Sequence, residues 1–361
     1  MRFSLCESKD PAFAPWRQPL EEGGPHALVH AAVLAANAHN SQPWRFRVGG
    51  DMVAVSADLQ RHLGSFDPFR REMQQSLGCA IENLMLAARA HGLAPDLQVR
   101  PRALPPPEAD PEAAVVRFTP CDPQVTDLFH AIPRRRTHRG RYRADRPVSE
   151  VERNDMLALQ DDLDARLLLF DGEGKRALGD LVISATREIV GDRQMAADNA
   201  KWFRFHAEEV SRHRDGLTLD ANVSSRLMAL AARLFPPSAE TANRKWIEDT
   251  AHSHVGTAAL LGVIVVGDPY ERAAAIAVGR LWQRLHLWLT AHDLAGQPLN
   301  QPIERVDRER EVGRPPRAAE ALSRIVGDAQ GRPAFIFRVG RPRREACFSP
   351  RRPVADVMVG G

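Results

Sequence analysis

The sequence predicts an α+β fold that is internally duplicated and carries a helical insertion. Three observations lead to this prediction. Two segments, 67–94 and 268–295, align without a gap, a strand-like pattern precedes each of them, and a polar segment of the second half has no counterpart in the first. The predicted halves are residues 1–125 and 126–361, with the insertion at about 191–250. One chain would thus contain two similar units arranged like the subunits of a dimer.

The repeated segments are DPFRREMQQSLGCAIENLMLAARAHGLA and DPYERAAAIAVGRLWQRLHLWLTAHDLA, and ten of their 28 aligned residues are identical. Two unrelated amphipathic helices are the alternative explanation. Each copy opens with Asp-Pro, which suits a helix start because Asp can cap and Pro lacks an N–H that would be unpaired there. Gly78 and Gly279 occupy the same position in the two aligned segments. Since a mid-helix Gly costs ~1 kcal/mol against Ala, its presence in both copies predicts close backbone packing.

The remaining elements also fit a mixed fold. Trp44–Val48 and Met52–Ala57 predict a hairpin around Gly49-Gly50-Asp51. Ser149 and Glu152 predict a capping box at the start of a helix. Further helices are predicted at Ala27–Asn37, Gly174–Val190 and, within the insertion, Val223–Leu234, and further strands at Ala114–Phe118, Arg166–Phe170, Leu260–Val266 and Pro333–Val339.

Composition narrows the function classes. The net charge is only +3, which argues against dedicated nucleic-acid binding, and 45 of the 49 basic residues are Arg. No apolar run reaches the roughly 18 residues of a membrane span, and the N-terminus lacks the apolar core of a signal peptide. The four Cys are far apart in sequence, which favours reduced thiols and a cytoplasmic location. His252 and His254 would share one side of a strand, but we predict no metal site.

The segment RRRTHRGRY, Arg134 to Tyr142, is the first chemically informative motif. Arg135, Thr137 and Arg139 alternate, so an extended chain would project them to one side. Arg binds phosphate through two parallel charge-assisted hydrogen bonds, and Thr adds a neutral donor. The motif therefore suits a cofactor with a phosphate group. A solvated basic loop and a nucleic-acid contact are the alternatives, although aromatic residues are sparse there.

Two further motifs are HNSQPWRF, His39 to Phe46, and SPRRP, Ser349 to Pro353. Asn40 and Gln42 offer amide donors and acceptors, and Pro43 extends and stiffens the chain before the strand. By themselves these residues also fit a polar loop that leads into a strand.

In this order the three motifs resemble the flavin-binding signature of the nitroreductase-like flavoproteins, most closely the Acg-like branch, in which two nitroreductase-like halves share one chain. The resemblance covers roughly residues 26–170 and 255–360. It implies a nitroreductase-like fold and one FMN held between the halves. The chain departs from the family pattern in two places: Ala36-Asn37 replaces the usual Pro-Ser, and His138 replaces a common Asn.

The resemblance also implies which residues bind the cofactor. The first half would contribute polar side chains, the second half an Arg-Thr-Arg set, the tail a basic pair near the phosphate, and GQPLNQPIE two residues near the reactive nitrogen of the flavin. The expected cofactor-binding residues are Asn37, Asn40, Gln42, Arg135, Thr137, Arg139, Gln301, Glu304, Arg351 and Arg352. No catalytic acid or base is assigned, because the flavin carries the chemistry.

The resemblance implies an FMN-dependent oxidoreductase that passes hydride from NAD(P)H to an electron-poor acceptor such as a nitroaromatic or quinone. A protein that stores or sequesters FMN without turnover is the alternative, with the insertion as a lid over the flavin. Nucleic-acid binding is a third and weaker hypothesis. Because both halves lie in one chain, we expect a monomer.

Overall fold

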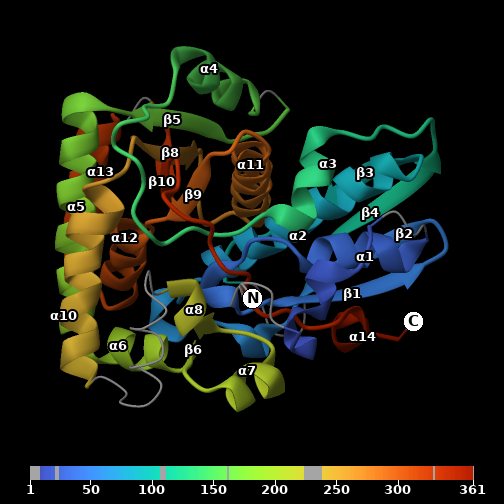
Figure 1. Ribbon diagram of the computed structural model, residues 1–361, viewed down its shortest axis with the longest axis horizontal. Coiled ribbons are helices and arrows are strands. Elements are labelled where there is room, and N and C mark those ends of the chain that lie inside the picture. Colours follow the sequence, from blue (N-terminus) through green and yellow to red (C-terminus); the bar gives the residue numbers. More distant parts are fainter. Residues whose placement is uncertain are drawn as a thin grey trace, which may run out of the picture.

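Two antiparallel four-stranded sheets with the same strand order form the framework of the protein (Figure 1). The computed structural model describes residues 9–20, 24–105, 111–160, 162–222, 238–327 and 330–360. The first sheet has the order β1 (Trp44–Gly49), β2 (Met52–Ala57), β4 (Glu112–Pro120) and β3 (Leu93–Val99). The second has the order β5 (Arg166–Phe170), β8 (Leu260–Val266), β10 (Arg332–Gly340) and β9 (Ala295–Pro298).

The duplication therefore extends from one helix to a whole unit. Along the chain each half has two strands, a long helix and two more strands, and corresponding strands occupy corresponding places in the two sheets. The predicted hairpin is confirmed, with Trp44 opposite Ala57. β5 has the predicted bounds, and β8 is buried along its whole length, as its apolar sequence indicates. The prediction of an internally duplicated α+β fold is thus confirmed.

The long helices are α2 (Arg71–Ala90) and α11 (Arg272–Ala291), and both begin later than the Asp-Pro pairs predict. Before α2 the chain first turns through Arg70, whose φ is 58°. Asp67 still caps the helix from this turn, since its carboxylate accepts hydrogen bonds from the backbone N–H groups of Glu72 and Met73 at 2.9 and 2.8 Å. The ends of the repeated segments are strands that the sequence pattern does not predict: Leu93 begins β3 and Ala295 begins β9.

The two long helices cross where each has its glycine. A Cβ atom on Gly78 would lie 2.2 Å from the carbonyl oxygen of Ile276, and one on Gly279 would lie 1.9 Å from that of Gln75. Gln75 and Ile276 are themselves equivalent positions of the repeat, so the contact is reciprocal, as in a twofold dimer interface. The predicted close packing is confirmed, and only glycine fits at either position.

Buried arginines at the first position of each long helix connect the two halves. Arg71 of α2 donates from Nη1 to the carbonyl of Ala334 in β10 at 2.8 Å. Arg272 of α11 donates from Nη1 to the carbonyl of Glu112 in β4, also at 2.8 Å. Each half thus contributes a cation that satisfies the closing strand of the other half. Because both side chains are fully buried, these contacts tie the halves into one core.

The other helices cover the sheets and the ends of the central pair (Figure 1). The predicted capping box at Ser149 and Glu152 opens α4, and the helix expected at Gly174–Val190 is α5. The helices outside the central pair and the insertion are η1 (Pro11–Arg17), α1 (Pro25–Val33), η2 (Ala38–Asn40), η3 (Leu59–Arg61), η4 (Gly64–Phe66), α3 (Asp127–Ala131), η5 (Ile132–Arg134), α4 (Glu150–Ala158), α5 (Gly172–Gly191), α12 (Gln301–Glu311), α13 (Arg317–Val326) and α14 (Val354–Val357).

Among the described residues, no helix combines the length and apolarity needed to cross a membrane.

The insertion connects β5 to β8, at the place where the first half has only the hairpin turn. Its predicted amphipathic helix at Val223–Leu234 lies outside the described residues. His252 and His254 lie in a π-helical turn, not in a strand, so the prediction that they share one strand face is wrong. The described elements are α6 (Arg193–Ala200), β6 (Phe203–Arg204), α7 (Ala207–His213), β7 (Leu217–Thr218), α8 (Leu219–Asn222), α10 (Ala239–Asp249) and η6 (Thr250–Val255).

The insertion packs against the first half. Met195 and Ile189 form a small buried cluster with Leu63 and Phe66, and Trp202 and Trp246 flank it. The C-terminal tail also returns to the first half, where Val359 donates its backbone N–H to Phe46 of β1 at 2.9 Å. The loop between α1 and β1 is therefore enclosed by segments from far along the chain.

Gly279→Ala tests the central contact. The new methyl group would meet a helix backbone, which cannot rotate away as a side chain can, so we expect a loss of about 1–3 kcal/mol or more in the free energy of unfolding. Gly191→Ala is the control, since this helical glycine has no atom within 4 Å of the added Cβ position. Urea unfolding of both variants provides the comparison. Equal stabilities would contradict the importance of the contact.

Candidate functional site

The loop that carries the first predicted motif has an unusual backbone. His39, Asn40 and Gln42 have φ values of 49°, 55° and 51°, a left-handed conformation that costs free energy for residues other than glycine. The loop is held by side chains: Asn37 Oδ1 accepts from the backbone N–H of Gln42 at 2.8 Å. Such a cluster of strained residues indicates a site whose shape is imposed by the surrounding structure.

Asn40 and Gln42 bind the tail and the insertion. Asn40 Nδ2 donates to the carbonyls of Pro350 at 3.0 Å and Gly216 at 3.2 Å, and Asn40 Oδ1 accepts from Arg351. Gln42 Oε1 accepts from the backbone N–H of Arg352 at 2.8 Å, and Gln42 Nε2 donates to the carbonyl of Arg214 at 2.8 Å. These two side chains therefore position the basic pair of the tail.

A narrow cavity of about 20 Å³ lies where the three motifs meet. Six of the ten predicted binding residues line it, although they come from both halves and from the tail. The lining residues are Trp16, Ala36, Asn37, Asn40, Arg135, Arg136, Thr137, Arg139, Cys347, Ser349 and Arg351. The structure therefore unites the arginine motif, the first polar motif and one arginine of SPRRP around the same space.

The cavity is strongly positive. Four arginines line it, and none of its lining residues is Asp or Glu. Burial lowers the pKa of Arg135 and of Arg139 to about 10. It also lowers the pKa of Arg351 well below the ordinary value, and the charge of Arg135 lowers it further. Buried cations are normally paired with anions. This one-sided arrangement therefore favours the binding of an anion.

Several guanidinium atoms in the cavity also lack a hydrogen-bond partner. The Nε atoms of Arg135, Arg136 and Arg351 are buried, and none of them donates a hydrogen bond to a partner among the described residues. Arg135 donates from Nη2 to the carbonyl of Leu34 at 3.2 Å, so its remaining donors are available to a ligand. Oriented and unsatisfied N–H donors of this kind match the acceptor oxygens of a phosphate group.

Sequence reasoning missed an aromatic and a basic residue that line the cavity, Trp16 and Arg136. Trp16 of η1 donates from Nε1 to the carbonyl of Ser349 at 2.8 Å and lies under the guanidinium of Arg351, 4.7 Å from ring centre to Cζ. Arg136 also lines the cavity and lies 4.0 Å from the ring centre of Phe348. No local pattern marks Trp16, because its role arises only when the N-terminal segment meets the tail.

Gln301 and Glu304 lie elsewhere, on the first turn of α12. The expected loop GQPLNQPIE is instead strand β9 followed by this helix. Both residues are buried, and each has one side-chain oxygen without a partner among the described residues: Gln301 Oε1 and Glu304 Oε2. Neither lines the arginine cavity. Arg352 and Gln42 are also outside its lining, although Arg351 and Asn40 connect them to it.

Glu304 belongs to a buried group of carboxylates at the start of α2. Burial raises the pKa of Asp67 to about 6 and that of Glu72 to about 7. Burial, reinforced by the negative charge of Glu72, raises the pKa of Glu304 well above the ordinary value. Arg71 is bound to Asp307 at 2.9 Å and provides a compensating positive charge. Burial thus shifts the pKa values of these carboxyl groups towards neutral pH.

Two other expectations concern cysteine and metal chemistry. Cys79 and Cys121 are free, but Cys347 is disulfide-bonded, so the prediction that the cysteines are all reduced is wrong for this one. In the part of the chain that the structure describes, no group of three or more His, Cys, Asp and Glu side chains is arranged to hold a metal ion.

Comparison with known proteins shows which sequences the chain resembles. Two curated Mycobacterium tuberculosis proteins match the chain, MT3217 of strain CDC 1551 and Rv3131 of strain H37Rv. Each is 27% identical over 320 residues, which are 87% of this chain and 83% of the relative. Both carry names that provisionally assign them as NAD(P)H nitroreductases. The chain is nitroreductase-like. No protein-family model matches it.

Solved nitroreductase structures also align with this nitroreductase-like chain. The FMN-dependent nitroreductase NfnB of Mycobacterium smegmatis, in complex with NADPH, is 16% identical with a TM-score of 0.41; the alignment covers 64% of this chain and 96% of NfnB. A Bacteroides fragilis nitroreductase with bound FMN is 11% identical with a TM-score of 0.37, and the alignment covers 63% of this chain and 95% of that protein.

The buried carboxylates predict how stability depends on pH. Because their pKa values are raised in the folded state, the folded protein binds protons that the unfolded chain releases, and stability should fall as pH rises through about 6 and 7. Glu304→Gln removes one such group. The free energy of unfolding of the variant, relative to that of the wild type, should therefore rise between pH 5 and pH 8, by at most about 1.4 kcal/mol per pH unit. Urea unfolding at both pH values measures this. The exposed Glu248→Gln should show the wild-type profile.

Proposed function

We propose that this nitroreductase-like chain is an FMN-dependent oxidoreductase that transfers hydride from NAD(P)H to an electron-poor acceptor such as a nitroaromatic or quinone. The observation that carries the proposal is the arginine cavity, in which the buried Arg135 and Arg351 and the half-buried Arg139 have no carboxylate among the lining residues. A phosphate monoester is the anion for which such a set of donors is suited. The names of the curated relatives support the redox reaction.

In this proposal each motif has a separate task. Arg135, Arg139 and Arg351 hold the phosphate, and Thr137 and Asn37 offer neutral hydrogen bonds beside it. Asn40 and Gln42 act by positioning Arg351 and Arg352 through the contacts described above. Gln301 and Glu304 are proposed to approach the ring system when the cofactor binds. Bound FMN would supply the hydride chemistry, and no protein side chain is assigned as a catalytic acid or base.

We further propose that the protein is a monomer of the Acg-like branch with one FMN. The reciprocal contact of α2 and α11 lies within one chain, so no second chain is needed to join the two halves. The two halves differ in their motifs, since the arginine cavity takes its lining arginines from residues after 134. This asymmetry favours one cofactor per chain.

The flavin content and its dependence on Arg135 test the proposal. Purified protein supplied with FMN should be yellow and bind one FMN per chain, a ratio that should persist on dilution. Arg135→Ala should weaken FMN binding by ~1.5–3 kcal/mol, or about ten- to a hundredfold, because a charge-assisted contact is lost. Arg141→Ala, an exposed position of the same segment, should change little. Absence of FMN binding would refute the proposal, and equal losses in both variants would indicate diffuse basicity.

A second candidate function is storage or sequestration of FMN without turnover. Hydrogen bonds between the insertion and the loop at the cavity favour this function. Gly216 donates its N–H to the carbonyl of Asn40 at 3.1 Å, and its carbonyl accepts from Asn40 Nδ2 at 3.2 Å. His39 adds a 3.0 Å hydrogen bond to Asn199 of α6. A segment held so firmly beside a narrow cavity would restrict the entry of nicotinamide.

Gly216→Ala separates the two candidates. Gly216 has a φ of 78°, and a Cβ there would lie 2.4 Å from the carbonyl oxygen of Trp202, so the substitution should weaken these hydrogen bonds. If the insertion limits access, reduction of bound FMN by NAD(P)H should become faster, as stopped-flow bleaching at constant FMN content would show. Gly191→Ala should leave the rate of FMN reduction at the wild-type value. No bleaching in any variant would favour storage, and an unchanged rate would show that this contact does not limit access.

A further inference from the structure

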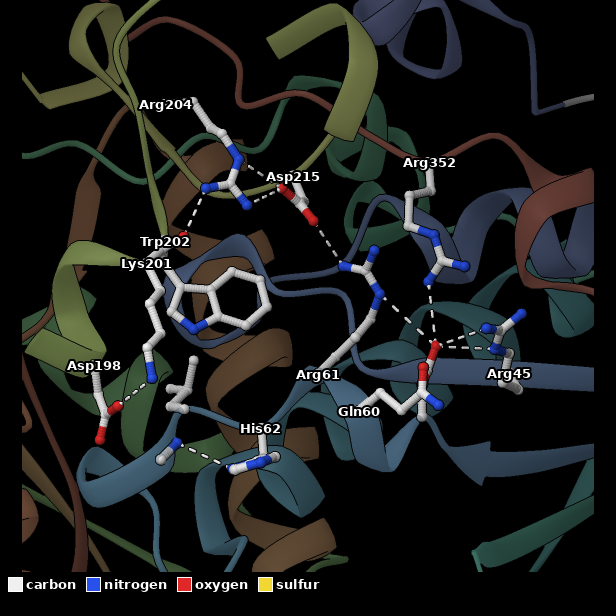
Figure 2. A pocket seen from close by; sticks show the side chains of 13 residues that line it. Arg45, Gln60, Arg61, His62, Asp198, Lys201, Trp202, Arg204, Asp215 and Arg352 are labelled. Atoms are coloured by element: carbon white, nitrogen blue, oxygen red, sulfur yellow. Dashed lines mark hydrogen bonds and ion pairs between the residues drawn. The ribbon is translucent and has the colours of Figure 1, made fainter. Parts of the chain in front are cut away.

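A second cavity, distinct from the arginine cavity, lies between the first half and the insertion. Its volume is about 470 Å³, within the range of small-molecule sites. It shares no lining residue with the first cavity. Figure 2 shows its basic side chains converging from separate elements. The lining residues are Arg45, Asp58, Gln60, Arg61, His62, Leu63, Gly64, Asp198, Lys201, Trp202, Arg204, Asp215 and Arg352.

Positive charge exceeds negative charge in this cavity. Its lining includes five Lys and Arg residues but only three Asp residues. The imbalance is greatest around Asp58, whose Oδ2 atom is shared by three guanidinium groups: Arg45 at 2.9 Å, Arg61 at 3.7 Å and Arg352 at 3.8 Å. One carboxylate thus faces three cations, and the two longer distances leave room for a competing anion.

Hydrogen bonds from neighbouring groups hold two of these cations in place. Arg352 donates to the carbonyl of Asp356 at 2.7 Å, and Arg61 donates to the carbonyl of Ser41 at 2.7 Å and to Asp215 at 2.9 Å. Burial, together with the neighbouring charges of Arg61 and Arg45, lowers the pKa of Arg352 to about 10. Repulsion among the three groups is therefore built into the fold, and a bound anion would relieve it.

The opposite wall offers an aromatic surface. Trp202 is half-buried and lies beside Arg204, whose Cζ is 6.0 Å from the indole ring centre. Arg204 in turn is bound to Asp215 through Nε at 3.0 Å and Nη2 at 2.8 Å. A ligand that bridges the two walls would need a charged group at one end and a planar apolar group at the other.

We propose that this cavity binds a small organic phosphate with a planar ring, whose phosphate contacts Arg45, Arg61 and Arg352 and whose ring lies against Trp202. The site requires no flavin and does not depend on the proposed redox function. It is, however, connected to the arginine cavity, because Arg351 and Arg352 are consecutive and Gln42 accepts from the N–H of Arg352. Occupancy of one cavity would thus affect the tail that borders both.

Isothermal titration calorimetry of the FMN-saturated protein with ADP and with pyrophosphate tests the proposal. Both should bind, and ADP should bind more tightly because it adds the ring. Arg61→Gln should weaken both at least about tenfold, since a charge-assisted contact is removed. Arg47→Gln is the control: Arg47 lies on the same strand as Arg45, is 41% exposed and pairs with Glu112 at 3.2 Å outside the cavity.

Two more variants keep the result independent of folding. Asp58→Asn removes the carboxylate that competes for the three guanidinium groups, so it should tighten the binding of both ligands severalfold. Trp202→Ala should weaken ADP and leave pyrophosphate unchanged. The proposal would be overturned by the absence of binding at millimolar ligand, by equal effects of Arg61→Gln and Arg47→Gln, or by unchanged affinity in Asp58→Asn. Equal binding of ADP and pyrophosphate would overturn the assignment of the ring to Trp202.

Discussion

The backbone contact between α2 and α11 is the constraint on which the rest of the structure depends. A glycine in each helix allows the backbones to approach so closely that a methyl group on either would overlap a carbonyl oxygen of the other. This approach sets the distance between the two sheets and brings the first residue of each helix within reach of the opposite sheet. Arg71 and Arg272 then become internal links between the halves. A duplicated unit thus acts as one core.

The site depends on this arrangement because its residues come from both halves. The first half presents a strained loop at residues 37–42, and the second half presents the arginines that begin at Arg135. Neither could enclose a cavity by itself. The tail completes the site, since Arg351 is fixed by Asn40. Burying several arginines without carboxylates is unfavourable in an isolated protein. Their retention therefore indicates a binding site for an anion.

The insertion adds contacts to both cavities that the two sheets and the central helices do not provide. It extends the second half back over the first and is bonded to the same loop that positions Arg351, through Gly216 and Asn199. It also forms one wall of the second basic cavity. The two cavities meet at the consecutive residues Arg351 and Arg352, so the tail is the shared boundary through which events in one cavity can reach the other.

The resemblance to the nitroreductase-like flavoproteins implied that the three motifs meet, whereas the sequence alone determined the duplication and most strands. Local signals sufficed there: apolar runs such as Leu260–Val266, the hairpin turn, and a Gly repeated at the same depth. The sequence pattern favours a helix to the end of each repeated segment, because the few residues there lack the alternation that would distinguish β3 and β9. The motif residues could be recognised, but not the difference between Arg135, which lines the cavity, and Gln42, which positions the tail.

Only the tertiary structure decided the features that depend on segments far apart in the chain. Trp16 joins the site because η1 meets the tail 333 residues later. The group of carboxyl groups with raised pKa values forms because the fold buries Glu304 beside Glu72. Asp58 faces three arginines because a strand, a short helix and the tail converge on it. Local sequence encodes secondary-structure propensity and hydrophobic periodicity. The burial and the electrostatic environment of a side chain depend instead on the distant residues that the folded core brings next to it.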